Sequence, residues 1–278
     1  MQNFLITGAT GFVGTQILKH LDQKNVKIKV IARPNSDNLF SKYKNITEVI
    51  STEDFFLETN DWYEKACEGI DIIIHCAWYA TPGKYLHSSL NETCYMGTMN
   101  FAQSASDAGI KKFIGIGSCF EYELMTNKKI DIDQPLNPLT KYARAKVETF
   151  NSLTLLFKKE KVNFIWARLF YLYGEGEDRR RLIPVLREKL TAGKKVALTK
   201  GNEIRDYMDV EEAGRVITEL ALSDRLGPFN VCSGQGVSIK ELAKNIAKDY
   251  DADYLLDFGS YQGSEKEPPY IVGLKYQV

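Results

Sequence analysis

The stretch Phe4-Leu5-Ile6-Thr7-Gly8-Ala9-Thr10-Gly11-Phe12-Val13-Gly14 decides the fold of this chain. Its apolar first half predicts a buried strand, and the residues from Gly14 to Leu21 predict an amphipathic helix. Gly8 permits a tight turn, Gly11 lets a diphosphate approach bare backbone, and Gly14 lets the helix lie close on the sheet. Backbone N–H groups at the start of the helix favour an anion. A dinucleotide site is therefore predicted here, with an ordinary turn as the alternative.

The composition argues against several classes of protein. The 278 residues include 36 basic and 36 acidic side chains, so no non-specific attraction to nucleic acid or to an anionic membrane is expected. The five cysteines lack C-x-x-C spacing, which indicates reduced thiols, and the three histidines are scattered, so we expect no metal site. Because Met1 leads into a core strand and no apolar run has membrane-spanning length, we expect a soluble, cytoplasmic protein.

Strands and helices alternate through the first 170 residues. The apolar run Val26–Ala32 completes a strand, helix, strand unit around the glycines. Runs such as Ile72-Ile73-Ile74 suit parallel strands that helices cover on both faces. Further strands are predicted at 46–50, 70–76, 112–117 and 164–170, and further helices at 61–66, 90–108 and 139–160. The pattern predicts an α/β fold with a doubly wound parallel sheet of the Rossmann type, whose ligands bind at the carboxyl ends of the strands.

The alternation breaks after residue 168. We expect a dinucleotide-binding domain at 1–168 and a smaller mixed substrate lobe at 169–278, with a helix at 182–192 and a strand at 196–198. A helix at 210–221 and a strand at 228–232 are expected to return in part to the large domain. Residues 122–138, which include two prolines, are predicted to form a loop.

Tyr142 and Lys146 are four residues apart in a predicted helix, so they share one face. A tyrosine, with a pKa of about 10, is a poor acid–base group at neutral pH unless a positive charge stabilises its phenolate. Lys146 is placed to provide that charge. Ser118 follows the strand 112–117, so its hydroxyl can hydrogen-bond a substrate carbonyl beside Tyr142. The alternatives are a packed tyrosine, a solvated lysine and a serine that only closes a turn.

The chain resembles the extended short-chain dehydrogenase/reductase family, which includes nucleotide-sugar epimerases, dehydratases and reductases. The resemblance spans nearly the whole sequence and rests on five motifs in order, Thr7–Gly14, Ser118–Tyr122, Tyr142–Lys146, Arg168–Gly174 and Gly201–Val210. It implies that Tyr142 donates or accepts a proton, that Lys146 activates Tyr142 and binds the nicotinamide ribose, and that Ser118 orients the carbonyl.

The binding residues follow partly from this resemblance. The predicted cofactor-binding residues are Gly8, Thr10, Gly11, Phe12, Val13, Gly14, Arg33, Asn35, Ser36, Asp54, Phe55, Cys76, Ala77, Trp78, Tyr142 and Lys146. Arg205 matches the arginine that grips the diphosphate of the nucleotide sugar, with a salt bridge to Asp206 or Asp209 as the alternative. Lys84, Tyr85 and His87 are expected either to line the sugar pocket or to be solvated loop residues.

The end of the second strand predicts which cofactor binds. NAD-specific sites place a carboxylate there for the ribose hydroxyls, whereas an arginine suits a 2′-phosphate. This strand ends Ile31-Ala32-Arg33, so we predict NADP, with Asn35 and Ser36 as further hydrogen-bonding groups. A solvated Arg33 is the alternative.

The chain departs from the pattern of its relatives at three places. Cys94 and Tyr171 stand where asparagines are usual, and Tyr171 is expected to contact the substrate differently. Cys119-Phe120 stand where 4,6-dehydratases have Asp-Glu, which disfavours dehydration. We therefore predict that NADPH reduces the C4 keto group of a nucleotide-linked 4-keto-6-deoxysugar, as in the 4-ketoreductases that the chain resembles.

Two other functions stay open, namely a nucleotide-sugar epimerase and a non-catalytic NADP-binding redox sensor. The helices 90–108 and 139–160 resemble those that pair into a dimeric bundle in the family, so a homodimer is expected.

Overall fold

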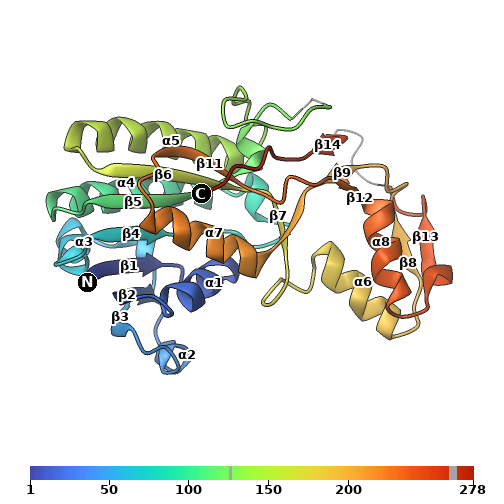
Figure 1. Ribbon diagram of the computed structural model, residues 1–278, viewed down its shortest axis with the longest axis horizontal. Helices are drawn as coiled ribbons and strands as arrows, with labels where there is room; N and C mark the ends of the chain where they lie inside the picture. Colours follow the sequence, from blue (N-terminus) through green and yellow to red (C-terminus); the bar gives the residue numbers. More distant parts are fainter. Residues whose placement is uncertain (125–126, 263–267) are drawn as a thin grey trace.

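A parallel sheet forms the larger part of the molecule in the computed structural model, which describes residues 1–124, 127–262 and 268–278 (Figure 1). Within these residues the sheet has seven strands in the order β11-β6-β5-β4-β1-β2-β3, and every neighbouring pair is parallel. The strands are β1 (Gln2–Thr7), β2 (Val26–Ala32), β3 (Ile46–Ser51), β4 (Ile72–His75), β5 (Lys112–Ser118), β6 (Asn163–Leu169) and β11 (Gly227–Val231). The direction in which strands are added reverses between β1 and β4, which is where such sheets bind ligands.

Helices cover both faces of this sheet (Figure 1). Side chains alternate along β1: Phe4 and Ile6 pack in the core with α1 (Phe12–Leu21) and α7 (Val210–Leu222), whereas Leu5 faces the opposite core. That second core is covered by α3 (Asn60–Cys67), α4 (Leu90–Asp107) and α5 (Lys141–Glu160). The predicted doubly wound α/β fold is therefore confirmed.

The predicted elements differ from the observed ones mainly at their ends. The helix predicted from residue 139 begins at Lys141, because the Thr140 side chain accepts a hydrogen bond from Ala143 N at 3.1 Å. The strand predicted at 70–76 is shorter and ends at His75. The predicted loop 122–138 contains an isolated bridge between Tyr122 and Leu136, and its residues 125 and 126 lie outside the described ones.

The smaller lobe packs two helices against a pair of strands. Leu186, Leu198 and Ala243 lie in its apolar core. Sequence analysis did not identify α8 or most of the short strands. The elements of this lobe are α6 (Leu182–Thr191), β8 (Val196–Leu198), α8 (Ile239–Lys248) and β13 (Leu256–Phe258).

Short elements connect the lobe to the sheet. The strand β7 (Tyr171–Tyr173) pairs with β10 (Tyr207–Asp209), and β9 (Ile204–Arg205) lies between β12 (Val237–Ser238) and β14 (Tyr270–Ile271). The remaining short helices are α2 (Asp37–Phe40) and the 3₁₀ turns η1 (Phe55–Leu57), η2 (Tyr85–His87), η3 (Cys119–Glu121) and η4 (Asp253–Leu255).

A buried carboxylate ties these connections together. Asp206, which is 0% exposed, accepts hydrogen bonds from Ser233 N at 2.8 Å, Gly234 N at 2.9 Å and Gly273 N at 3.2 Å. The Ser233 hydroxyl donates to it as well, at 2.5 Å. Three chain segments therefore meet on one side chain, which is the acceptor for a backbone N–H from two of them.

We predict that Asp206→Ala lowers the free energy of unfolding by about 3 kcal/mol or more, because several buried donors lose their acceptor together. Urea denaturation measures the loss. Asp257→Ala is the control, since Asp257 is an exposed residue on β13 and its replacement should leave the midpoint unchanged. An Asp206→Ala midpoint equal to that of the control would contradict the role of this carboxylate.

Candidate active site

A cavity of about 800 Å³ lies at the carboxyl ends of the strands and reaches the lobe. The large sheet contributes the glycine turn after β1 and the ends of β2, β4 and β5, while α5 contributes Tyr142 and Lys146. The lobe side contributes residues 176–178, Arg181 and Leu182. The predicted residues that line this cavity are Gly8, Thr10, Gly11, Phe12, Val13, Gly14, Arg33, Asp54, Phe55, Cys76, Ala77, Trp78, Tyr85, Ser118, Tyr142, Lys146 and Tyr171.

The glycine turn has no room for side chains. Gly8 has a φ of 69°, and a Cβ added there would lie 2.8 Å from Ala77 N. A Cβ at Gly14 would lie 2.2 Å from the Gly8 carbonyl oxygen. The close approach that Gly14 permits is thus to the turn itself, and not to the sheet as the sequence suggested.

The start of α1 fits a diphosphate. Gly11 is its N-cap and makes no side-chain hydrogen bond to the helix, and the first turn contains no acidic residue. No side chain accepts hydrogen bonds from the first N–H groups of the helix, so a bound anion can accept them instead. The residues present therefore fit the diphosphate of a dinucleotide.

The end of β3 closes another wall of the cavity. Asp54 accepts a hydrogen bond from Phe56 N at 3.0 Å and so caps η1, while Phe55 packs edge-on against Phe101 with ring centroids 5.0 Å apart. Arg33 is exposed at the end of β2 and also lines the cavity. An apolar ring and a cation therefore both line the cavity.

Ser118 is held by a capping box at the end of β5. Its hydroxyl accepts a hydrogen bond from Phe120 N at 3.2 Å, and its own N–H donates to Glu121 Oε1 at 2.7 Å. Ser118 therefore does close a turn, which was the alternative role expected from the sequence. Ser118 and Tyr142 line the same cavity, which brings two of the three predicted catalytic side chains together.

Glu121 is 0% exposed and is satisfied entirely by protein groups. Besides Ser118 N, it accepts hydrogen bonds from Trp166 Nε1 at 2.9 Å and Arg168 Nε at 2.7 Å. The Arg168 guanidinium lies 4.6 Å from the centre of the Tyr122 ring and donates to its hydroxyl at 3.0 Å. Glu121 belongs to the Ser118–Tyr122 motif, but no role could be predicted for it from the sequence.

Tyr142 lies in an aromatic part of the cavity. Its ring is edge-on to Tyr85 at 4.8 Å and to Trp78 at 6.5 Å between centroids. Burial raises its pKa, and the nearby Tyr85 and Glu121 raise it further, whereas the neighbouring Ser118 hydroxyl lowers it. The phenol is therefore protonated at neutral pH and holds its proton more firmly than a free tyrosine does.

Lys146 is 4% exposed and lies behind Tyr142. Its ammonium donates to the Ile116 carbonyl at 2.7 Å and stands 5.9 Å from the centre of the Tyr142 ring. Burial lowers its pKa to about 7, an effect that the charge of Glu121 partly opposes. Lys146 therefore faces Tyr142, as the sequence spacing predicts. In the described structure its positive charge lies near the Tyr142 ring, and the two side chains are not joined by a direct hydrogen bond.

Five predicted binding residues do not line the cavity, namely Asn35, Ser36, Lys84, His87 and Arg205. Arg205 is only 1% exposed, donates to the Ile204 carbonyl at 2.9 Å and lies 5.6 Å from the centre of the Tyr171 ring. Burial on β9 therefore separates its guanidinium from the cavity wall. The interpretation of these five as ligand contacts stays a prediction.

Arg181 is a cavity residue that sequence analysis did not single out. It is half-buried as the N-cap of α6, and its charge acts on Tyr85 across the cavity. Neighbouring Arg180 instead pairs with Asp178 at 2.7 Å. The run of three arginines at 179–181 could have indicated an anion-binding residue, but the sequence could not show which of the three lines the cavity.

The departures from the family pattern have visible consequences. Cys94 accepts a hydrogen bond from Tyr79 N at 3.3 Å, so a thiol holds the loop after β4. Cys119 and Phe120 both line the cavity, and all five cysteines are free thiols. Buried His75 is held between Thr7 and Thr98 at 2.8 and 2.9 Å, which agrees with a structural histidine.

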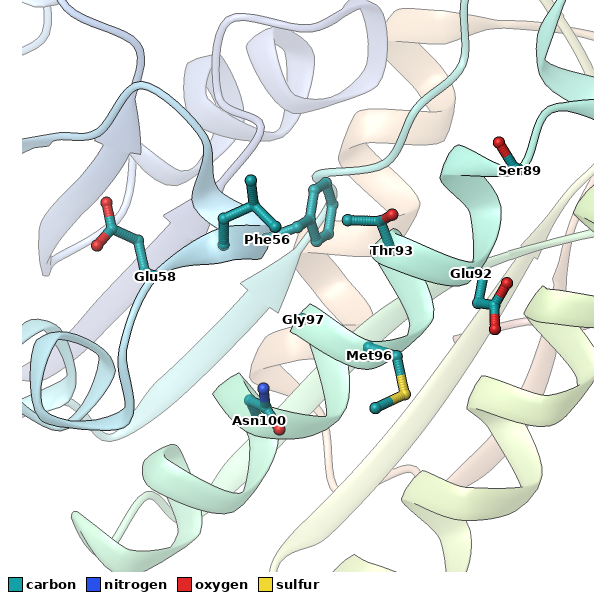
Figure 2. Close-up of a pocket in the computed structure, with 9 residues that line it drawn as sticks. Phe56, Glu58, Ser89, Glu92, Thr93, Met96, Gly97 and Asn100 are labelled. Atoms are coloured by element: carbon teal, nitrogen blue, oxygen red, sulfur yellow. The ribbon is translucent and has the colours of Figure 1, made fainter.

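A second pocket, of about 530 Å³, lies between the segment 56–58 and α4 (Figure 2). Figure 2 shows Phe56 above Gly97, where a Cβ would lie 2.5 Å from Phe56 O. Gly97 therefore lets the segment after Asp54 pack directly on α4. The pocket contains Glu92 and Met96 but none of the predicted catalytic residues.

Neither a metal centre nor a membrane helix is found in the described residues. No group of three or more His, Cys, Asp or Glu side chains there could hold a metal ion. No helix in the same residues is long and apolar enough to cross a membrane.

The fold and the cavity define a dinucleotide-dependent enzyme of the extended short-chain dehydrogenase/reductase type. Residues 4–232 match the NAD dependent epimerase/dehydratase family, and the chain belongs to this family. The resemblance seen in the motifs is thus confirmed.

Individual relatives are distant but extend over most of the chain. The dTDP-6-deoxy-L-talose 4-dehydrogenase (NAD(+)) of Aggregatibacter actinomycetemcomitans is 24% identical over 260 residues, 90% of this chain and 91% of that protein. The ADP-L-glycero-D-manno-heptose-6-epimerase of Brachyspira hyodysenteriae is 27% identical over 264 residues, 88% of this chain and 80% of that protein.

Solved structures show the same fold. The UDP-N-acetylglucosamine 4-epimerase of Methanobrevibacter ruminantium M1, in complex with UDP-N-acetylmuramic acid, has a TM-score of 0.87 at 20% identity and covers 99% of this chain and 89% of its own. The Bordetella bronchiseptica enzyme WbmG, in complex with NAD, has a TM-score of 0.79 at 24% identity and covers 98% and 84%.

Proposed function

We propose that this protein reduces the C4 keto group of a nucleotide-linked 4-keto-6-deoxysugar with NADPH. The observation that carries the proposal is the convergence of Ser118, Tyr142 and Lys146 in the same cavity as the glycine turn. The 4-dehydrogenase named above acts, by its name, on a deoxytalose nucleotide at the same carbon. Cys119 and Phe120 line the cavity where a dehydratase needs an acid pair, which favours reduction over elimination.

The side chains divide the work of reduction. NADPH, when bound, supplies a hydride for the carbonyl carbon. Ser118 hydrogen-bonds the carbonyl oxygen and holds it beside Tyr142, which gives its phenolic proton to that oxygen as negative charge develops. Lys146 stabilises the tyrosinate that is left, and solvent then returns the proton. Each turnover consumes one NADPH and one proton, and leaves a hydroxyl at C4.

We predict that Tyr142→Phe lowers kcat by a factor of about 10² to 10⁴, because the proton donor is lost, while NADPH still binds. The decrease in absorbance at 340 nm with 4-keto-6-deoxy nucleotide sugars measures turnover. Tyr254→Phe is the matched control, since Tyr254 is 78% exposed on the lobe.

The same assay separates the alternatives. An epimerase would convert the sugar without net consumption of NADPH. A redox sensor would bind NADP and turn over none of the sugars. Full activity of Tyr142→Phe would refute the proposed proton transfer.

We propose NADP as the cofactor because Arg33 lines the cavity at the end of β2, where Ala32 provides no carboxylate. The relative from Aggregatibacter is named as an NAD(+) enzyme and WbmG contains NAD, so this preference would distinguish the present chain from them. A guanidinium suits a 2′-phosphate because it can form two parallel charged hydrogen bonds.

We predict that Arg33→Ala weakens NADPH binding by about 10- to 100-fold, the effect of losing a charged hydrogen bond, and leaves NADH binding nearly unchanged. Fluorescence titration with both cofactors measures the two dissociation constants. The NADH constant serves as the internal control for folding. Equal losses for both cofactors, or a wild-type protein that prefers NADH, would overturn the assignment.

We propose that Arg181 contributes to binding the diphosphate of the nucleotide sugar. Its guanidinium belongs to the cavity wall at the start of α6, whereas Arg205 is buried beside that wall. A helix N-terminus and a guanidinium together favour a diphosphate. Tyr171 and Tyr85 line the same cavity.

We predict that Arg181→Ala raises the KM for the nucleotide sugar by about 10-fold or more and leaves the Kd for NADPH unchanged. Arg180→Ala is the matched control, since Arg180 points to Asp178 and is not part of the cavity wall. If Arg205→Ala instead carries the whole effect, the original assignment to Arg205 is correct. If Arg181→Ala instead weakens NADPH binding, Arg181 contacts the cofactor and not the nucleotide sugar.

We also propose a cytoplasmic homodimer that forms through α4 and α5. These helices pack side by side and are joined by a hydrogen bond between Tyr95 and Ser152 at 3.2 Å. Exposed apolar side chains lie on both of them, with Met96 at 55% and Leu155 at 72%. A second copy of the chain would bury this surface.

A further inference from the structure

The Lys146 ammonium lies against the face of an indole. Its Nζ atom is 3.5 Å from the centre of the Trp78 ring, compared with 5.6 Å for Trp166 and 5.9 Å for Tyr142. A cation within about 6 Å of an aromatic face is attracted by the electron density of the ring, most strongly when both are out of water. Lys146 is buried, so its cation–π contact with Trp78 is stronger than such a contact on the protein surface.

The Trp78 indole is itself fixed in place. Its Nε1 donates to Asn91 Oδ1 at 2.9 Å, and Asn91 is 1% exposed. The Asn91 amide donates in turn to the Tyr85 carbonyl at 2.6 Å and the Ser88 carbonyl at 2.9 Å. Because the Tyr85 ring packs against Tyr142, the chain of contacts from Trp78 leads back to the catalytic tyrosine. The indole therefore has little freedom to leave the ammonium.

The other groups around Lys146 supply little charge. Glu121 on η3 favours the ammonium from a distance, but its oxygens are occupied by Ser118 N, Trp166 and Arg168. Cys76 after β4 and Cys94 on α4 are protonated thiols, because burial raises the pKa of both.

His75 on β4 is neutral, since burial and the Lys146 charge lower its pKa to about 3. Tyr142, one turn away on α5, is a neutral phenol. Within the described residues no carboxylate forms an ion pair with Lys146. The Ile116 carbonyl and the Trp78 face are its close partners.

We propose that Trp78 is a positioning residue, whose indole face keeps the Lys146 ammonium charged and directed toward Tyr142. The catalytic consequence rests on the proposed reduction, because only a charged Lys146 can stabilise the tyrosinate. The contact itself does not depend on which substrate is used. Removing it destabilises the charged form, so the pKa of Lys146 falls and the charge is lost at a lower pH.

The test replaces Trp78 alone by a ring-fluorinated tryptophan. Fluorine withdraws electron density from the ring and weakens its attraction for a cation, while the shape and the N–H to Asn91 are kept. The pKa of Lys146 is followed by the ¹³Cε NMR signal of labelled lysine, which is identified by its loss in Lys146→Arg. We expect the pKa to fall by about one unit. Trp78→Leu should shift it as far, and Trp78→Phe should shift it less.

The pH dependence of kcat/KM with NADPH and a 4-keto sugar nucleotide gives the second measurement. The decline on the alkaline side should move to lower pH by the same amount as the Lys146 pKa. A purely structural role would lower kcat/KM at every pH without moving the decline. An unchanged pKa in the folded fluorinated protein would overturn the proposal. If the pKa falls but no keto sugar is reduced, the proposed reaction fails and the role of Trp78 stands.

Discussion

The buried carboxylate of Glu121 is the interaction on which the site depends. A charge without water is costly unless it is paired and fully hydrogen-bonded, and Glu121 meets this condition with Ser118 N, Trp166 and Arg168. The same arrangement explains Gly117, where a Cβ would lie 2.6 Å from the Glu121 carboxylate and 2.3 Å from the Trp166 indole nitrogen. The ends of β5 and β6 are thereby locked together, and Ser118 is presented to the cavity in one orientation.

The catalytic side chains come from two elements that are joined below the cavity. Ser118 ends β5, and Lys146 on α5 returns to the Ile116 carbonyl two residues earlier in the same strand. Tyr142 precedes Lys146 by one turn of α5 and lines the same cavity as Ser118. The geometry is therefore set by backbone positions at the edge of the sheet.

The parts of the fold and site that the sequence predicted are those governed by local patterns. Apolar runs separated by helical stretches were enough to predict a doubly wound parallel sheet, and glycine spacing was enough for the turn at Gly8. The helical period placed Tyr142 and Lys146 on one face. Residues on the lobe could not be placed in the same way, because burial there depends on pairing between distant short strands. Arg205 matches its motif yet is buried on β9, and Arg181 reaches the cavity from a run of similar residues.

The position of β11 affects how the chain folds while it is being synthesised on the ribosome. This strand pairs with β6 along its whole length but follows it by more than fifty residues, after α6 and the first lobe strands. During synthesis β6 is an edge strand until residue 231 has left the ribosome, and the α1 face is uncovered until α7 is complete at residue 222. The glycine turn is synthesised first, but α7, which packs on α1, and β11, which completes the sheet, are synthesised late. Folding of the cofactor site is therefore tied to completion of the sheet by the last third of the chain.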